Sequence, residues 1–378
     1  MKELKRLDVA GSATEKSKKD FFVQWHLTSR CNLACAHCYQ EGGHGPELDF
    51  AAIRRLAGEV SDMVGGWAED YDIPFSPSFN VTGGEPLLLG DIVEVLRLLK
   101  GEGFQVYLLT NGTLVDEERA KRLSGLVDGV QISIEGPEGL HDSIRGKGAF
   151  LEAMKGTLRL VGQDIPVAFN MTLSTLNVDS LDEVVSIALD AGVRRVGFSR
   201  LVPYGRGKGL AGKMLSPGKV RETYGRLLEF RDDRIEITTG DPIAASLEGP
   251  KADGGDFPFG GCAAAVSGLT ILPDATLLPC RRLPVPIGNT RTASIRRIWT
   301  QSPVLNMLRD RKAYVGRCGR CSRWADCRGC RAVAYACSRL SGKADFLADD
   351  PQCFLQTGSG RTATDIQPAG LERWKGTC

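Results

Sequence analysis

From residue 21 onward, short runs of β-branched and aromatic residues alternate with longer stretches in which apolar residues recur at helical spacing. Within the stretch 49–64, for example, Ile53, Leu56 and Val60 follow one another at intervals of three and four. The pattern predicts six strand-and-helix pairs, with strands at 21–27, 78–82, 105–110, 130–134, 167–173 and 195–201 and helices at 49–64, 92–99, 117–126, 150–161, 181–191 and 219–230. Such alternation predicts an α/β fold with a parallel sheet, either open or closed into a barrel.

The alternation stops near residue 235, and the composition changes there. Gly and Pro become frequent in 249–261, and nine of the twelve cysteines lie between Cys262 and Cys378. We therefore expect a second, loop-rich domain that is held by metal rather than by a large apolar core. The predicted division is an N-terminal tail at 1–20, a first domain at 21–235, a second domain at 236–355 and a C-terminal tail at 356–378.

Charge and composition argue against several classes of partner. The chain has 48 basic and 46 acidic residues, so it has no basic surplus for binding nucleic acid or a membrane surface. No apolar stretch is long enough to span a bilayer, and the lysine-rich residues 1–20 lack the apolar core of a signal peptide. Twelve cysteines without an export signal indicate a reducing, cytoplasmic location, where metal binding is favoured over disulfides.

Cys31, Cys35 and Cys38 form a CxxxCxxC motif directly after the first predicted strand. Three thiolates on one short loop can hold three irons of a four-iron cluster and leave the fourth iron open for chemistry. The alternatives are a zinc loop or buried free cysteines, but zinc sites usually combine CxxC pairs and four protein ligands. The spacing resembles the cluster motif of the radical S-adenosylmethionine (radical SAM) enzymes, in which the open iron chelates the methionine part of the cofactor.

This resemblance implies a partial (β/α)6 TIM-like barrel with its ligand site at the carboxyl ends of the strands. Motifs similar to those of the family follow several predicted strands. Gly83-Gly84-Glu85-Pro86 resembles the GGEP segment that binds the methionine ammonium, although GG before a helix is also an ordinary turn. The run from Ser133 to Arg145 resembles the S-[IL]-[DE]-G…HDxxRG pattern, in which the serine contacts the cofactor and the arginine binds the methionine carboxylate.

The family resemblance also implies cofactor contacts at single residues outside these motifs. Tyr39 is a candidate for a ring beside the adenine, Asn170 for a ribose contact, and Leu201 and Val202 for the lining of the adenine pocket; core positions are the alternative for these last two residues. The expected set is therefore the three catalytic cluster ligands Cys31, Cys35 and Cys38 and the cofactor-binding residues Tyr39, Gly83, Gly84, Glu85, Ser133, Arg145, Asn170 and Leu201.

The distal cysteines resemble a SPASM domain, an extension that carries two auxiliary iron–sulfur clusters in peptide-modifying members of the family. The pattern implies an outer cluster and an inner cluster, held respectively by Cys318, Cys321, Cys327 and Cys353, and by Cys262, Cys280 and Cys330. The spacing between Cys327 and Cys330 is one residue shorter than usual, and no cysteine lies between Cys38 and Cys262 to complete the inner cluster. Either Cys337 completes it or one iron is left open. Taken alone, the two CxxC pairs would favour a zinc ribbon. Together with the triplet at Cys31, Cys35 and Cys38, iron–sulfur clusters explain all three groups of cysteines by one chemistry.

The family resemblance implies an enzyme that cleaves S-adenosylmethionine to a 5′-deoxyadenosyl radical, using an external electron donor such as ferredoxin or flavodoxin. The expected substrate is a ribosomally synthesised peptide, which would receive a thioether, carbon–carbon or related crosslink. Only about twenty residues precede the first strand, which is too short for a leader-binding domain. We therefore expect any leader to be recognised by the barrel, by the second domain or by a separate protein.

An alternative substrate is a tetrapyrrole. The Tyr204-Gly-Arg-Gly run and the segment around Cys327 also resemble the tetrapyrrole side-chain enzymes of alternative haem and haem d1 synthesis. Sulfatase-maturing members carry an acidic base after the cysteine equivalent to Cys280, whereas Arg281 and Arg282 stand here, so formylglycine formation is disfavoured. A non-enzymatic iron–sulfur electron carrier would not need the motifs at the strand ends.

Overall fold

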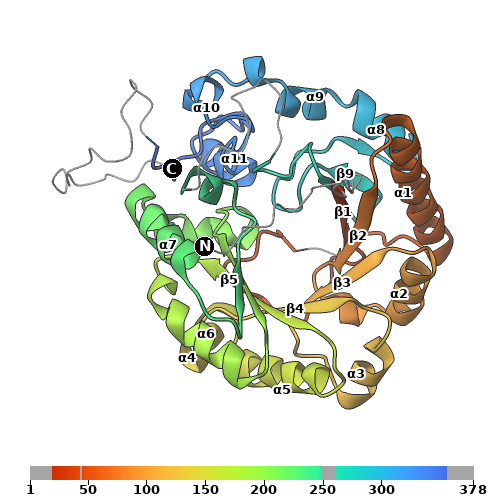
Figure 1. Ribbon diagram of the computed structural model, residues 1–378, viewed down its shortest axis with the longest axis vertical. Helices are drawn as coiled ribbons and strands as arrows, with labels where there is room; N and C mark the ends of the chain where they lie inside the picture. Colours follow the sequence, from red (N-terminus) through yellow and green to blue (C-terminus); the bar gives the residue numbers. More distant parts are fainter. Residues whose placement is uncertain (1–18, 43–44, 248–259, 356–378) are drawn as a thin grey trace, which may run out of the picture.

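One ten-stranded sheet runs through the part of the chain that the computed structural model describes, residues 19–42, 45–247 and 260–355 (Figure 1). The strand order is β10-β9-β8-β1-β2-β3-β4-β5-β6-β7. The strands are β1 (Lys19–His26), β2 (Phe75–Thr82), β3 (Gln105–Thr110), β4 (Gly129–Ser133), β5 (Val167–Leu173), β6 (Arg195–Arg200), β7 (Glu236–Thr238), β8 (Gly268–Ile271), β9 (Thr276–Leu278) and β10 (Gly288–Asn289).

Helices cover the outside of the curved parallel part of the sheet, as Figure 1 shows. These helices are α1 (Phe50–Tyr71), α2 (Ile92–Gly101), α3 (Glu117–Leu123), α4 (Glu138–Arg145), α5 (Ala149–Val161), α6 (Leu181–Asp190) and α7 (Pro217–Glu229). The C-terminal region adds α8 (Ile295–Gln301), α9 (Pro303–Arg309), α10 (Arg317–Arg320) and α11 (Arg331–Leu340). Short 3₁₀ segments lie at η1 (Pro86–Leu88), η2 (Val178–Ser180), η3 (Gly205–Lys213), η4 (Pro242–Leu247) and η5 (Arg311–Ala313).

All six predicted strand-and-helix pairs are present, and β1 to β7 pair in parallel. This confirms the α/β barrel-like fold with a loop-rich C-terminal region. Helix α1 shows why these segments fold as they do: the Asp49 side chain accepts a hydrogen bond from the Ala52 amide at 2.7 Å and caps the helix. The helix then buries one apolar face against the sheet. It extends to Tyr71, beyond the predicted end at residue 64, and Trp67 packs edge-on against Phe21 of β1.

Two elements lacked a sequence signal. Helix α4 is short, and only His141 and Ile144 are buried, so it has too few apolar residues to give a clear helical spacing. Strand β7 is three residues long and lies at the end of the sheet. Both lead to residues of the site described below. Helix α4 ends at Arg145, which lines the site, and β7 leads into Asp241, which pairs with the site residue Arg200.

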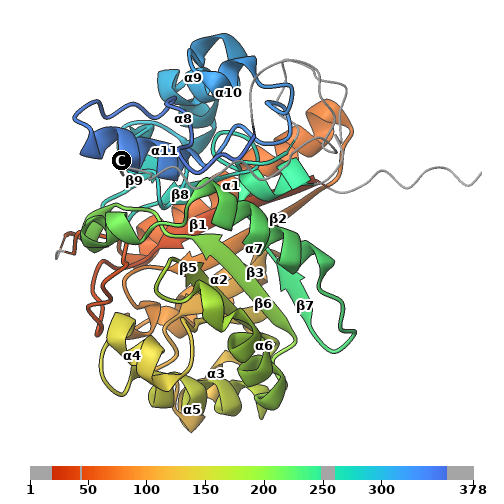
Figure 2. The ribbon, with the colours of Figure 1, turned by 90° about the vertical axis from the view of Figure 1, so that its left-hand side faces the viewer.

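The C-terminal region continues the same sheet. Strand β8 pairs in parallel with β1, with Phe22 opposite Gly268, and β9 returns antiparallel to β8. The turn between them holds Ala275 in a left-handed conformation with φ of 74°, a conformation in which glycine would be less strained. Helices α8 to α11 then lie together at one end of the molecule (Figure 2). Strands β7 and β8 both follow the predicted division at residue 235, yet they pair with β6 and β1, which precede it. The two predicted domains therefore share one sheet.

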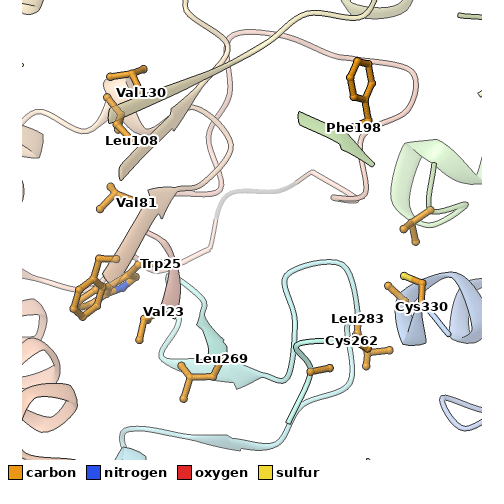
Figure 3. Packing of buried hydrophobic residues seen from close by; sticks show 14 of the residues in the cluster. Val23, Trp25, Val81, Leu108, Val130, Phe198, Cys262, Leu269, Leu283 and Cys330 are labelled. Atoms are coloured by element: carbon orange, nitrogen blue, oxygen red, sulfur yellow. The ribbon is translucent and has the colours of Figure 1, made fainter. Parts of the chain in front are cut away.

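The apolar core is also continuous across this division. Figure 3 shows Val23 and Trp25 of β1 near Leu269 of β8, and all three side chains are almost fully buried. Burying such side chains stabilises a fold by about 1.5–3 kcal/mol each. Within the described residues, no helix combines the length and the apolar character needed to cross a membrane. The predicted tails at 1–20 and 356–378 lie almost entirely outside the described residues; only Lys19 and Asp20 are described, and they belong to β1.

Candidate active site

A cavity of about 160 Å³ lies at the carboxyl ends of strands β1 to β6. Nine of the eleven residues predicted to bind the cluster or the cofactor line it: Cys31, Cys35, Cys38, Tyr39, Gly83, Gly84, Ser133, Arg145 and Asn170. They come from distant positions in the sequence, and the parallel sheet brings them together because all its strands end on the same side.

The three cysteines of the loop after β1 face this cavity. The Cys38 amide donates to the Cys35 carbonyl at 3.3 Å, and the Ala36 amide donates to the carbonyl of Ile144 in α4 at 2.8 Å, which fixes the loop against α4. Burial raises the pKa of the Cys35 thiol, and the nearby Arg145 guanidinium opposes that rise. Among the described residues, no fourth cysteine lines the cavity. Three thiols and an open side fit a four-iron cluster with one free iron better than a four-ligand zinc site.

Gly83 and Gly84 bring the backbone at the end of β2 against the cysteine loop. The Gly84 amide donates to the Thr28 carbonyl at 2.8 Å, and the Gln40 side chain donates to the Gly83 carbonyl at 2.7 Å. A Cβ atom on Gly84 would lie 2.1 Å from the Arg30 carbonyl oxygen, so no larger residue fits there. At Gly83 and Gly84, therefore, only backbone atoms can line the cavity.

Glu85, unlike Gly83 and Gly84, does not line the cavity. Its carboxylate is fully buried and accepts hydrogen bonds from the Thr110 hydroxyl at 2.7 Å and the Asn111 amide at 2.8 Å. Burial raises the pKa of this carboxyl group, although these hydrogen bonds oppose the rise. The side chain thus joins the end of β2 to the end of β3 and does not line the cavity.

Arg145 is held beside the cysteine loop by Glu135. Its guanidinium donates to Glu135 Oε1 from Nη2 at 2.6 Å and from Nε at 3.0 Å, and its Nη1 lies 3.8 Å from Cys35 Sγ. Glu135 also lies 3.3 Å from His37 Nε2. Burial alone would raise the pKa of Glu135, but the His37 ring and Arg145 outweigh it and hold the pKa well below its usual value. The site therefore keeps a buried carboxylate and a charged guanidinium next to the thiols.

The other predicted cofactor residues are placed as follows. Ser133 of β4 and Asn170 of β5 are register partners and both line the cavity. Tyr39 also lines it, with its hydroxyl 3.4 Å from His26 Nε2 and the Arg281 guanidinium 6.0 Å from its ring centre. Of the two residues predicted for the adenine pocket, Val202 lines the cavity, whereas Leu201 is buried in the core and does not line it.

Of the distal cysteines, the sequence assigned four to an outer set and three to an inner set. A second cavity is lined by all four residues expected at the outer cluster, Cys318, Cys321, Cys327 and Cys353. Of the other group, Cys262 lies on the opposite side of Leu283 from Cys330 in Figure 3, and the Cys262 amide donates to the Cys327 carbonyl at 3.2 Å. Burial raises the pKa of the Cys330 thiol to about 12, so metal binding there must displace a proton.

Several cavity residues were not predicted. Arg206, Arg281 and Arg282 line the cavity, and Glu135 holds Arg145. Glu135 could have been found, because it lies inside the serine motif at 133–136. Arg206 lies in the Tyr204-Gly-Arg-Gly run, and the two later arginines directly follow Cys280. Their charge was visible in the sequence, but nothing local indicated that they face the cysteine loop.

Comparison with known proteins agrees with this geometry. Residues 25–188 match the model of the radical SAM superfamily, and residues 262–322 match the SPASM model, an iron-sulfur cluster-binding domain. The chain is 30% identical over 350 residues to an AdoMet-dependent heme synthase of Nitratidesulfovibrio vulgaris, covering 88% of this chain and 91% of that protein. It is 27% identical over 360 residues to a PqqA peptide cyclase of Methylocella silvestris, covering 92% of this chain and 90% of that protein.

The fold is also similar to a solved structure. Streptococcus suis SuiB bound to S-adenosylmethionine has a TM-score of 0.63 at 16% identity, covering 89% of this chain and 78% of SuiB. The two family matches, the relatives and the cysteine-lined cavity at the strand ends agree with one another. The chain therefore belongs to the radical SAM superfamily and carries a SPASM domain; it is a radical SAM enzyme that uses S-adenosylmethionine and iron–sulfur clusters.

Proposed function

We propose that this enzyme modifies the side chains of a tetrapyrrole that carries carboxylates, as in alternative haem or haem d1 synthesis. The observation that carries the proposal is the pair Arg281 and Arg282, which lines the cavity beside the cysteine loop. Among the described residues, neither arginine has an acidic group within ion-pair distance, although Arg282 donates to the Arg200 carbonyl at 3.2 Å. A guanidinium matches a carboxylate in shape and charge, so the side of the cavity that Arg281 and Arg282 line suits a substrate with several carboxylates.

The chain and its cofactors would divide the work. When bound, the cluster and S-adenosylmethionine supply a 5′-deoxyadenosyl radical that abstracts a hydrogen atom from the substrate. Cys31, Cys35 and Cys38 would hold the cluster, and Arg145 would hold the cofactor's carboxylate. Arg281 and Arg282 would fix the substrate's carboxylates, so that a single hydrogen lies within reach of the radical. The cavity walls would keep water away during the reaction.

The tetrapyrrole proposal is tested by anaerobic turnover of the reconstituted enzyme with iron coproporphyrin III and, separately, with a short cysteine-containing peptide. We expect 5′-deoxyadenosine formation to rise with the porphyrin and the porphyrin mass to change. Mass spectrometry and chromatography measure both. A mass change in the peptide and none in the porphyrin would contradict the proposal.

A peptide crosslink is the second candidate, as the sequence first suggested. It is supported by the similarity to a PqqA peptide cyclase over most of the chain and by the shared fold with SuiB, of which one structure contains the precursor peptide SuiA. The turnover comparison above separates the two candidates.

Replacing Arg281 by Ala is expected to raise the KM for a carboxylate substrate about 10-fold to 100-fold, because a charge-assisted hydrogen bond contributes about 1.5–3 kcal/mol. Arg281→Lys should recover part of the lost substrate affinity, since lysine keeps the positive charge but lacks the planar guanidinium that binds a carboxylate with two hydrogen bonds. The matched control is Arg291→Ala, an exposed arginine whose Nε lies 3.5 Å from the Asp274 carbonyl. Steady-state kinetics measure the effect. Equal KM values for Arg281→Ala and the control would remove Arg281 from substrate binding.

We further propose two auxiliary clusters, both [4Fe-4S], with an open iron in the inner one. The outer set is supported by the four cysteines that share one cavity. For the inner set, Cys280 and Cys330 both lie close enough to Arg282 to raise the pKa of its guanidinium against the effect of burial. Cys337 lies two helical turns from Cys330 along α11, about 10 Å by helix rise, and its sulfur lies 3.7 Å from Met214 Sδ.

Cys337→Ala is therefore expected to leave the iron content and the auxiliary-cluster EPR signals unchanged, because Met214 rather than an iron would be its neighbour. The comparison variant is Cys330→Ala, which should lose iron. Iron analysis and EPR of the anaerobically reconstituted proteins measure both. Iron loss in Cys337→Ala would identify Cys337 as the fourth ligand, and so would a structure with four protein ligands on the inner cluster.

We also propose that an external donor such as ferredoxin or flavodoxin reduces the enzyme in the cytoplasm. The described residues contain eleven cysteines and all are free thiols, as expected in a reducing compartment.

A further inference from the structure

The turn Gly205-Arg206-Gly207, which opens η3 after β6, lies directly against the cysteine loop. The Gly207 amide donates to the Cys38 carbonyl at 3.0 Å. The Arg206 Nε donates to the Cys35 carbonyl at 3.0 Å, across 171 positions of sequence. Two backbone carbonyls of the cysteine loop are therefore satisfied by one short turn from a distant part of the chain.

The two glycines make this close contact possible. Gly205 has a φ of 59°, and a Cβ atom on it would lie 2.5 Å from the Tyr39 carbonyl carbon. A Cβ atom on Gly207 would lie 2.9 Å from the Val202 oxygen and 3.0 Å from the His37 oxygen. Real Cβ atoms are not found at such distances from backbone, so any side chain would push the turn off the loop. Two further glycines in η3, Gly209 and Gly212, have no neighbouring atom within 4 Å of the place that a Cβ would take.

The sheet itself does not hold the cysteine loop against this side of the barrel. Four strands separate β1 from β6 in the sheet order, and the two strands do not pair. Figure 3 shows Phe198 of β6 on the opposite side of the view from Val23 and Trp25 of β1. A loop that follows β1 would therefore be free to move away from β6 unless something bridges the opening. The turn after β6 makes that bridge.

We propose that the Gly205-Arg206-Gly207 turn is a clamp that holds the cysteine loop in the geometry needed to bind the cluster and S-adenosylmethionine. Arg206 is a positioning residue in this clamp, because its Nε donates a hydrogen bond to the Cys35 carbonyl. Arg206 also lines the cavity. The described residues include no acidic group within ion-pair distance of Arg206 that could draw it away. This role does not depend on which substrate the enzyme takes.

The clamp is tested on the full-length, anaerobically reconstituted holoenzyme with the variants Gly205→Ala, Arg206→Ala and Arg206→Lys. Gly209→Ala is the matched control, because it makes the same change in the same segment without a close neighbour. Hydrogen–deuterium exchange is followed in peptides that cover 35–40 and 205–209. We expect at least 10-fold faster exchange there in Gly205→Ala and Arg206→Ala, and wild-type exchange in the control. Arg206→Lys should restore part of the protection, since its ammonium can still donate to a carbonyl.

A second readout is the EPR spectrum of the reduced cluster at Cys31, Cys35 and Cys38 when S-adenosylmethionine is added. Gly205→Ala should require at least 10-fold more cofactor for the same spectral change, whereas Gly209→Ala should behave as wild type. Wild-type exchange and an unchanged cofactor requirement in both Gly205→Ala and Arg206→Ala would overturn the clamp. An equal rise of exchange in α2, which packs against α1 and β3, would mean general unfolding and would overturn it as well.

Discussion

Replacing Cys31, Cys35 and Cys38 together by Ala is expected to abolish 5′-deoxyadenosine formation while iron stays bound at the auxiliary sites. The three thiols are the only cysteines, among the described residues, that line the cavity at the strand ends. Without them the cluster that reduces S-adenosylmethionine has no ligands. The four cysteines of the outer auxiliary group line a separate cavity in the C-terminal region and keep their own surroundings.

Chromatography of anaerobic, dithionite-reduced reactions measures the 5′-deoxyadenosine, and iron analysis measures the clusters that remain. The single variants Cys31→Ala, Cys35→Ala and Cys38→Ala should each be as inactive as the triple variant, since the three ligands act as one unit. Cofactor cleavage at the wild-type rate in the triple variant would refute the assignment of this site. Loss of all iron would instead show that the site at Cys31, Cys35 and Cys38 and the auxiliary sites do not fold independently of one another.

Replacing Arg200 by Met is expected to lower the stability of the protein by about 3–5 kcal/mol, because it leaves two buried carboxylates without their cation. Arg200 at the end of β6 donates to Asp241 at 2.6 Å and to Asp350 at 2.8 Å, and the side chains of all three are at most 1% exposed. Asp350 also accepts a hydrogen bond from the Cys330 amide at 2.9 Å. Arg200→Met should therefore also make the position of Cys330 less fixed.

The matched control is Arg195→Met on the same strand. Arg195 pairs with Glu236 at 2.7 Å, but both side chains are more than half exposed, so this pair contributes at most about 1 kcal/mol. Urea unfolding midpoints of the two variants are compared rather than extrapolated free energies, because bound clusters break the two-state condition that the extrapolation requires. Similar midpoints for the two variants would show that the buried network does not join the barrel to the C-terminal segment.

The local periodicity of the sequence determined most of the fold. Apolar residues at helical spacing and short β-type runs predicted six strand-and-helix pairs, since both signals arise from neighbours a few positions apart. The same holds for the cysteine loop, where Cys31, Cys35 and Cys38 are close in sequence and therefore close in space. A parallel sheet then requires the strand ends to meet, so most of the predicted cofactor residues line one cavity.

Only the tertiary structure decided which side chains face that cavity. Glu85 turns inward because Thr110 and Asn111 offer it hydrogen bonds at 2.7 and 2.8 Å, whereas the motif alone leaves it beside its two glycines. In the same way, Leu201 is buried and Val202 lines the cavity. Both residues are buried, and which of the two lines the cavity depends on elements distant in sequence, which the local spacing of residues does not reveal.

The same limit applies to the longest-range features. Strand β8 extends the barrel sheet by pairing with β1, which lies far earlier in the chain, although the change in composition at residue 235 suggested a separate unit. The sequence named Cys31, Cys35 and Cys38 as the site of radical chemistry. The packing of β6, η3 and the segment after Cys280 decided that Arg206, Arg281 and Arg282 surround it, because such contacts form only once the sheet has curved and brought distant loops together.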